Sequence, residues 1–398
     1  MAEKIFQAVG LDLGSQHTRI VACILENSRI RFCGYGEYPS QGWVKGGIAD
    51  QQAVAESIMG ALAEAERTSG LPVEQAVVGI GGPTVRGANS RGIIDTGRPR
   101  EIEQRDVNRA IDRATHVQLQ EDRMVVQLFP QDFVVDDHPG HRDPRKMIAS
   151  RLEANVHLIT GSVLEHTCLV SAVNQAHLVV EETVFEPLAA CFAAVLPEDR
   201  VEGIAVVDIG AHSTDLVVYH GDALQLASTL PICGDHFTRD LAAGLRIGFE
   251  DAALVKEEYG CAISSSTAEN SIVEVPSHGR EPREVQRRYL NAILEARAQE
   301  LFLHVRRELA RVGMDRCLMS GLVLTGGGAK LPGMCDMAEG VLPCHARNGL
   351  ATGIMDWPED LDNPAWTVAA GLAMYSGRLK LQGELERQSV GLLGRILG

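Results

Sequence analysis

The strongest constraint on the fold is a pattern of residues that occurs twice, about half a chain length apart. The first copy spans residues 9–21 (VGLDLGSQHTRIV) and has two aliphatic runs that flank a polar turn. The second copy spans residues 206–218 (VVDIGAHSTDLVV), with Asp208 and Gly210 in register with Asp12 and Gly14. Each copy predicts a β-hairpin with a tight polar turn. Two such turns in one register indicate a chain built from two related halves.

Turns of this kind can bind phosphate. Their backbone N–H groups and hydroxyls can donate to phosphate oxygens, and a nearby carboxylate can hold the accompanying cation. A third stretch at residues 322–333 (LVLTGGGAKLPG) predicts a strand that runs into three glycines, where the backbone can approach a base or a ribose closely. Any one stretch alone could be an ordinary turn, whereas all three in this order favour a nucleotide site shared by the two halves.

The three stretches resemble the phosphate-1, phosphate-2 and adenosine loops of the actin, Hsp70 and sugar-kinase superfamily. The resemblance implies an α/β, actin-like fold with two RNase H-like halves around a nucleotide cleft. Residues 186–194 and 365–373 are rich in small side chains and are similar to the two connecting helices of that superfamily. Each could also be an ordinary buried helix.

Composition narrows the class of protein. Of the 398 residues, 45% are hydrophobic and 23% are charged, which is typical of a soluble globular protein with two or more domains. The net charge of −16 argues against a nucleic-acid partner, because a phosphate backbone requires a basic surface. The nine cysteines are scattered without zinc-like spacing, which indicates reduced thiols in a cytosolic protein.

An insertion narrows the resemblance to one family. Residues 84–162 carry no phosphate loop and predict a small α+β block inside the first half. With FPQDF at 129–133 and RLEANVHLIT at 151–160, this block resembles subdomain 1C of FtsA, the bacterial actin homologue that tethers the tubulin-like FtsZ ring to the inner membrane. Residues 260–262, 273–277 and 295–297 are also similar to FtsA, as is a C-terminal amphipathic helix. The chain departs from the family at Ala211 and His212, where FtsA usually has glycines and more room for phosphates.

The resemblance divides the chain into four subdomains and a tail. Subdomain 1A comprises residues 1–83 and 163–192, 1C comprises 84–162, 2A comprises 193–236 and 319–377, 2B comprises 237–318, and a linker with the terminal helix comprises 378–398.

The resemblance also implies that ATP and Mg²⁺ lie between the halves. The expected cofactor-binding residues are Asp12, Gly14, Ser15, Gln16, Arg19, Asp208, Gly210, Ser213, Thr214, Lys256, Glu257, Gly326, Gly327, Gly328 and Lys330. Asp12 and Asp208 are expected to hold Mg²⁺ through its water ligands. Glu186 is the candidate to orient an attacking water. Any ATPase activity is expected to be slow, with nucleotide acting as a conformational ligand.

The tail predicts a short helix with one apolar face. Val390, Leu392, Leu393, Ile396 and Leu397 fall on one arc, with Arg395 opposite. The pattern fits either a terminal helix docked on its own domain or a membrane-surface anchor. With few basic residues the anchor would be weak alone, so stable attachment needs several copies held together.

By resemblance, the chain is an actin-like cell division protein at the cytoplasmic face of the bacterial inner membrane, at the division site. It is expected to polymerise head to tail and to bind the C-terminal tail of FtsZ, inner membrane lipids and other division proteins. The FtsZ contact is assigned to Arg287, Arg288 and Arg297, although such arginines are more often a solvated helix face. The alternatives are a cytosolic ATP-binding assembly factor of the pilus-assembly type and a small-molecule kinase, which would need a sugar pocket that the sequence does not indicate.

Overall fold

The computed structural model describes residues 6–116, 119–276 and 282–396, with side chains in the last helix described as far as residue 383. The helices are α1 (Gln51–Ser69), α2 (Gln104–Thr115), α3 (Val163–Gln175), α4 (Glu186–Ala194), α5 (Pro197–Glu202), α6 (Gly234–Leu245), α7 (Phe249–Tyr259), α8 (Arg287–Arg311), α9 (Met334–Val341) and α10 (Thr367–Ile396). The strands are β1 (Phe6–Leu13), β2 (His17–Glu26), β3 (Arg29–Pro39), β4 (Trp43–Val44), β5 (Gly47–Ile48), β6 (Gln75–Ile80), β7 (Arg86–Glu101), β8 (Arg123–Val135), β9 (His138–His141), β10 (Ile148–Ser162), β11 (Val179–Phe185), β12 (Ile204–Ile209), β13 (Thr214–His220), β14 (Ala223–Leu230), β15 (Ile272–Val275), β16 (Arg283–Gln286), β17 (Gly321–Thr325), β18 (Ala346–Asn348) and β19 (Ile354–Met355).

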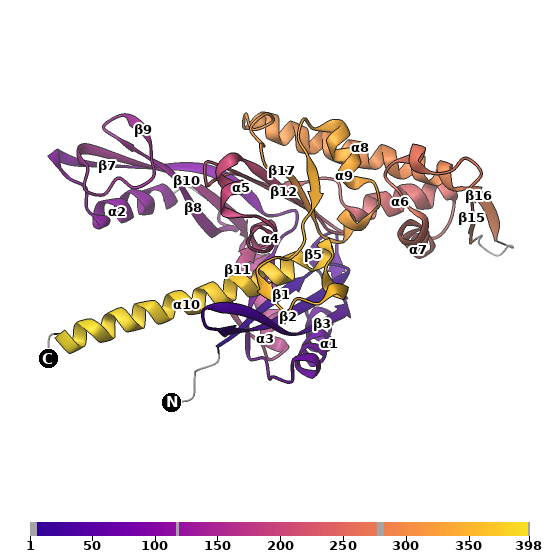
Figure 1. Cartoon of the computed structure of the whole chain (residues 1–398), viewed down its shortest axis with the longest axis horizontal. Helices are drawn as coiled ribbons and strands as arrows, with labels where there is room; N and C mark the ends of the chain where they lie inside the picture. Colours follow the sequence, from indigo (N-terminus) through magenta and orange to yellow (C-terminus); the bar gives the residue numbers. More distant parts are fainter. Residues whose placement is uncertain (1–5, 117–118, 277–281, 397–398) are drawn as a thin grey trace.

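Figure 1 shows a body around β1, β2 and β3, above which two arms extend in opposite directions, one built on β7 to β10 and one on α6 to α8.

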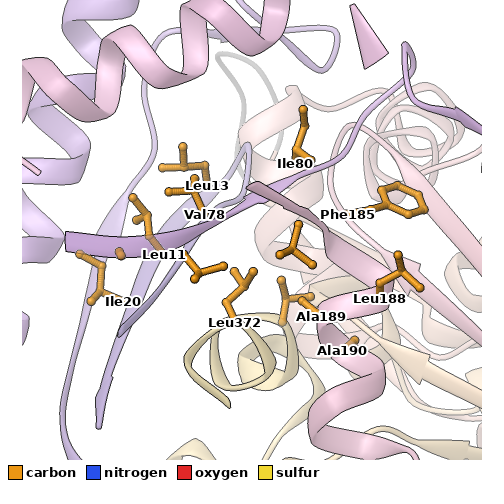
Figure 2. Close-up of a cluster of buried hydrophobic side chains, with 14 of the residues drawn as sticks. Leu11, Leu13, Ile20, Val78, Ile80, Phe185, Leu188, Ala189, Ala190 and Leu372 are labelled. Carbon is orange, nitrogen blue, oxygen red and sulfur yellow. The ribbon is translucent and has the colours of Figure 1, made fainter. Parts of the chain in front are cut away.

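The first half is a six-stranded sheet in the order β11-β6-β1-β2-β3-β19. β1 and β2 pair antiparallel along their length, which confirms the first predicted hairpin. Residues 8–13 of β1 are all buried, because helices, among them α10, pack on the sheet. A strand that is covered in this way carries a nearly continuous aliphatic run rather than an alternating pattern. Figure 2 shows Leu11 and Val78 of the sheet in one buried cluster with Leu188 of α4 and Leu372 of α10.

The second half repeats this plan with a five-stranded sheet in the order β14-β13-β12-β17-β18. β12 and β13 form the second predicted hairpin, in which Asp208 lies opposite Asp215. Apolar residues of α6, α8 and α9, such as Leu241, Leu294 and Met334, share one core with the strands. Both phosphate-loop candidates therefore follow a buried central strand of their own sheet.

Residues 86–162 form the separate arm expected for the insertion, a four-stranded sheet in the order β7-β10-β8-β9 covered by α2. In the sequence, Pro130 interrupts the alternating strand pattern of residues 125–135. The strand continues through this exposed residue, and its register with β10 shifts beside it, which is how a sheet accommodates a residue without an N–H donor. The carboxylate of Asp106, which is fully buried, accepts two hydrogen bonds of 2.7 Å from Arg100 and attaches α2 to β7.

The 2B arm differs in one detail from the sequence prediction. The apolar period of residues 284–312 predicts one long helix that begins at Glu284, but residues 283–286 form β16, which pairs with β15, and α8 begins at Arg287. Residues 283–286 are only four, and their exposed and half-buried side chains alternate weakly. The hydrophobic period of so short a segment cannot distinguish a strand from the first turn of a helix.

The C-terminal segment also differs from the prediction. β19 pairs with β3, and α10 packs on β1 and α4, so residues 354–377 lie with the first sheet although they were assigned to the second half. A Cβ at Gly371 would stand 1.8 Å from the carbonyl oxygen of Ala189, so only glycine permits this approach of α10 to α4. The predicted linker after residue 377 is helical instead, because the Leu, Lys, Gln, Glu and Arg residues there favour helix. No helix in the described part of the chain is long and apolar enough to cross a membrane.

Candidate functional site

A cleft of about 370 Å³ lies between the two halves, and the three predicted loops meet in it. Of the predicted site residues, those that line the cleft are Asp12, Gly14, Ser15, Gln16, Arg19, Glu186, Asp208, Gly210, Ser213, Lys256, Glu257, Gly326, Gly327, Gly328 and Lys330. They come from distant parts of the sequence and from both halves, so the fold brings together the residues that the repeat and the resemblance indicated.

The first loop joins β1 to β2. Its backbone is fixed by Ser40, whose hydroxyl donates to the carbonyl oxygen of Gly14 at 2.6 Å. Arg19 pairs with Glu37 at 2.7 Å, and its guanidinium lies 5.4 Å from the ring of Trp366. The Nε of Arg19 is buried and has no partner among the described residues. An arginine held in this way leaves one N–H available to a ligand in the cleft.

The second loop joins β12 to β13 and is closed by a 2.9 Å hydrogen bond from the N–H of Gly210 to the carbonyl of Ser213. Asp208, at the end of β12, accepts a 2.9 Å hydrogen bond from the hydroxyl of Thr325, which precedes the glycine loop. Thr214 is the predicted contact that does not line the cleft. Successive residues of a strand face opposite sides, so Ser213 faces the cleft while Thr214 is fully buried in the sheet.

Three carboxylates, Asp12, Asp208 and Glu186, line the base of the cleft and a fourth lies behind it, and Arg19 is the cation that acts on the two aspartates of the lining. Burial, reinforced by the charge of Asp208, raises the pKa of Asp12 to about 7 despite Arg19. Burial likewise raises the pKa of Asp208 to about 6, although Thr325 and Arg19 oppose the shift. The pKa of Glu186 is raised well above its usual range by burial and by the neighbouring aspartates. Such a cluster suits a site that receives a cation.

Sequence reasoning missed the fourth carboxylate, Asp215. It lies just behind the second loop, where it accepts hydrogen bonds from Ser213 at 3.1 Å and from the N–H of Gly82 at 3.5 Å. Burial raises its pKa to about 7. The repeat offered a signal, because Asp215 occupies the register position of Arg19, so the two copies place opposite charges at equivalent points.

Glu186 is at the first turn of α4 and reaches the cleft through a gap left by glycine. A Cβ on Gly81 would stand 2.2 Å from Oε2 of Glu186, so a side chain at this position would displace the carboxylate. Gly81 and Gly82 line the cleft, whereas in the sequence Gly81, Gly82 and Pro83 indicate only the end of the strand pattern of residues 76–81. His212 and Trp43 also line it, and neither had been predicted as a contact.

On the 2B side, Lys256 donates to the hydroxyl of Thr238 at 2.8 Å, and burial lowers the pKa of this lysine. Glu257 and Lys330 line the same end of the cleft. Within the described residues, no three His, Cys, Asp or Glu side chains converge to ligate a metal ion directly.

The arginines assigned to a partner lie outside the cleft and are engaged within 2B. Arg287 donates to the carbonyl of Tyr259 at 2.8 Å, and Arg297 pairs with Asp240 at 2.6 Å. Arg288 pairs at 2.9 Å with Glu269, whose side chain is 88% exposed. Of the expected membrane residues, Val390, Leu392, Leu393, Arg395 and Ile396 belong to α10, beyond the point to which its side chains are described, and Leu397 lies outside the described residues.

Comparison with known proteins identifies the family. The sequence model for "Cell division protein FtsA" matches residues 205–371, and that for "SHS2 domain inserted in FTSA" matches residues 82–160. The cell division protein FtsA of Pseudomonas aeruginosa is 32% identical over 392 residues, which cover 98% of this chain and 92% of that protein. This chain belongs to the FtsA family. The FtsA of Escherichia coli K12 is 30% identical over 387 residues, with 95% of this chain and 92% of that protein covered.

Solved structures that resemble this FtsA-family chain show its fold. A PilM-PilN type IV pilus biogenesis complex is similar with a TM-score of 0.69 at 18% identity, over 93% of this chain and 98% of that chain. MreB5 of Spiroplasma citri bound to ADP is similar with a TM-score of 0.57 at 13% identity, over 95% of this chain and 98% of that chain. The fold is therefore actin-like with an FtsA-type insertion, as the sequence predicted.

Proposed function

We propose that the cleft of this FtsA-family cell division protein binds ATP with Mg²⁺. The observation that carries the proposal is the convergence of two phosphate-loop hairpins and a glycine loop in one cleft that both halves line. Asp12 and Asp208 would hold a hydrated Mg²⁺ through its waters, which fits the absence of a direct three-ligand site among the described residues. The cation would supply the charge that neutralises the triphosphate. Ser15, Arg19 and Ser213 would contact the phosphates.

We propose further that nucleotide acts mainly as a conformational ligand, with at most slow hydrolysis. Glu186 would orient a water, but burial and the neighbouring aspartates raise its pKa well above its usual range, which favours the protonated form and weakens it as a proton acceptor. A ligand that contacts both halves stabilises their closed arrangement by its differential affinity for that arrangement.

The test of this site is equilibrium binding of a fluorescent ATP analogue with and without Mg²⁺. The unsubstituted chain should bind it, and Asp208→Ala should abolish binding, with Asp137→Ala on the exposed β8–β9 turn as a matched control. Unchanged affinity in the Asp208 variant would refute the site. Affinity that is equal with Mg²⁺ and with a chelator would refute the cation.

We also propose that the chain polymerises and tethers FtsZ filaments to the inner membrane through residues 390–397. The family membership supports this role. A head-to-tail contact that does not close produces a filament, and many weak terminal helices on one filament would bind a membrane tightly. The match to the FtsA family favours division over the pilus-assembly alternative, because the likeness to PilM concerns the fold alone.

The membrane proposal is tested by co-sedimentation with liposomes of anionic lipid, in the presence of ATP. The whole chain should pellet with lipid, and a chain that ends at Gln388 should stay in the supernatant. Equal pelleting of both would show that the last residues are not the anchor.

For the FtsZ tail, we propose the 2B arm as the docking surface for a short peptide. Arg288 is the best of the three arginines, because its partner Glu269 is exposed and the pair is readily broken. Tyr289 beside it is 53% exposed and offers an apolar contact. Arg288→Glu should weaken binding of an FtsZ tail peptide in a fluorescence anisotropy titration, whereas Arg105→Glu on α2 should not. Equal affinities would remove this surface from consideration.

A further inference from the structure

A small hairpin of the first half extends over the nucleotide cleft. β4 and β5 pair antiparallel around a turn at Lys45 and Gly46, and the carbonyl of Gly42 accepts from the N–H groups of Ala49 and Asp50 at 2.8 and 3.1 Å. Trp43, Gly46, Gly47 and Ile48 line the cleft. The hairpin is short and pairs only with itself rather than with the main sheet, while Trp43 and Ile48 pack against the core of the first half.

The tip of this hairpin is bonded to the opposite half. The backbone N–H of Gly46 donates to Nδ1 of His212 at 3.3 Å, and His212 belongs to the second phosphate loop. The Nε2 of the same ring lies 3.4 Å from Oδ2 of Asp235 at the start of α6. One neutral tautomer satisfies both contacts, since Nδ1 must accept while Nε2–H donates.

We propose that His212 is a latch that holds the β4–β5 hairpin closed over the phosphate end of the cleft and thereby slows nucleotide release. The proposal rests on the nucleotide binding proposed above. His212 directly precedes Ser213, so the latch joins the hairpin to a predicted phosphate contact. Opening the hairpin requires the Gly46–His212 contact to break, whichever half moves.

Trp43 gives a second, independent observation on the hairpin. The residue lines the cleft, but its indole Nε1 is buried and finds no acceptor among the described residues. A buried donor without an acceptor is unfavourable, and an indole N–H normally finds a partner. The closed position of the hairpin therefore carries an unfavourable group, which a movement that exposes this N–H would relieve.

The test compares His212→Ala, which loses both contacts, with His212→Asn, whose side-chain oxygen can replace Nδ1 as the acceptor for Gly46. His220→Ala is the matched control, because His220 is the last residue of β13, the strand that follows the second loop, and does not line this cleft. Dissociation of a fluorescent ATP analogue is followed by stopped flow after a chase with ATP. Hydrogen exchange of the peptide that contains residues 43–48 is measured without nucleotide.

Loss of a net hydrogen bond should accelerate dissociation roughly 5–10-fold in His212→Ala, with a smaller effect on association, and should speed exchange of the hairpin amides. The dissociation rates of His212→Asn and His220→Ala should stay within about twofold of the rate of the unsubstituted chain, because both variants keep an acceptor for the N–H of Gly46. Unchanged dissociation in His212→Ala, or an Asn variant that behaves like the Ala variant, would overturn the latch. Failure of the unsubstituted chain to bind nucleotide would refute the proposed function instead, and the exchange measurement would still test the latch.

Discussion

Replacing Asp12 by asparagine should stabilise the nucleotide-free protein at alkaline pH. The folded protein raises the pKa of Asp12 from 3.8 to about 7, so ionising this carboxyl costs about 4 kcal/mol more in the folded than in the unfolded chain. Asparagine avoids that cost but buries an amide whose N–H groups lose water, at about 1–3 kcal/mol. The variant should therefore be about 1–3 kcal/mol more stable above pH 8.

The pH dependence of the stability difference between Asp12→Asn and the unsubstituted chain is the more specific part of this prediction. Because the folded pKa is raised, the stability linked to this proton is fully present below pH 4 and is lost as pH rises through 7. At pH 5 most of that stability remains, so the variant and the unsubstituted chain should differ little. Urea denaturation at pH 5 and pH 8.5, without Mg²⁺ or nucleotide, measures both values. Asp137→Asn on an exposed turn is the control, and an Asp12→Asn variant that is no more stable at pH 8.5 than at pH 5, relative to the unsubstituted chain, would refute the reasoning.

Two further predictions concern the fold that supports the site. Asp106→Ala should destabilise the insertion by about 1.5–3 kcal/mol, because it removes the two charge-assisted hydrogen bonds from the partly exposed Arg100, and faster hydrogen exchange in residues 86–162 should report it. The pKa of Asp106 is lowered to about 2 in the folded protein. The insertion of the unsubstituted chain should therefore lose this stability as pH falls toward 2 and Asp106 is protonated. Gly371→Ala should destabilise the protein by about 1–3 kcal/mol, because its Cβ would stand 1.8 Å from the carbonyl oxygen of Ala189. Gly383→Ala in the same helix meets nothing within 4 Å and should stabilise the protein by up to about 1 kcal/mol. Thermal unfolding measures both changes.

The two hairpins, the glycine loop and the insertion could be predicted from sequence because their signals are local. Apolar runs of strand length, an Asp-x-Gly turn and three successive glycines each specify a backbone conformation without reference to the rest of the chain. The repeat then supplied the long-range information, since two equivalent turns imply two equivalent halves that face each other. Fourteen of the fifteen cofactor contacts that the resemblance implied line the cleft, and the exception is Thr214, which is fully buried in β13.

The features that sequence reasoning missed depend on tertiary packing. The place of α10 on the first sheet follows from the approach of Gly371 to α4, which no periodicity reveals. The β4–β5 hairpin has two residues in each strand, too few for an alternating pattern. The partners of Asp215 come from Gly82 and Ser213, one of them far away in sequence, so its burial could not be read from its neighbours.

The unfavourable free energy of burying several ionisable carboxyl groups in one place is itself an argument that the site binds a cation. Asp12, Asp208 and Asp215 are each less than 10% exposed, their pKa values are raised by burial, and they come from both halves of the chain. A fold that needed only stability would place apolar or amide side chains there, as the Asp12→Asn prediction states. The arrangement becomes favourable when a cation enters, because the ionised carboxylates that burial disfavours are then attracted to the cation from both sides of the cleft. Closure of the two halves should accordingly depend on the cation as well as on the nucleotide, and small-angle scattering with ATP alone and with ATP and Mg²⁺ should distinguish the two states.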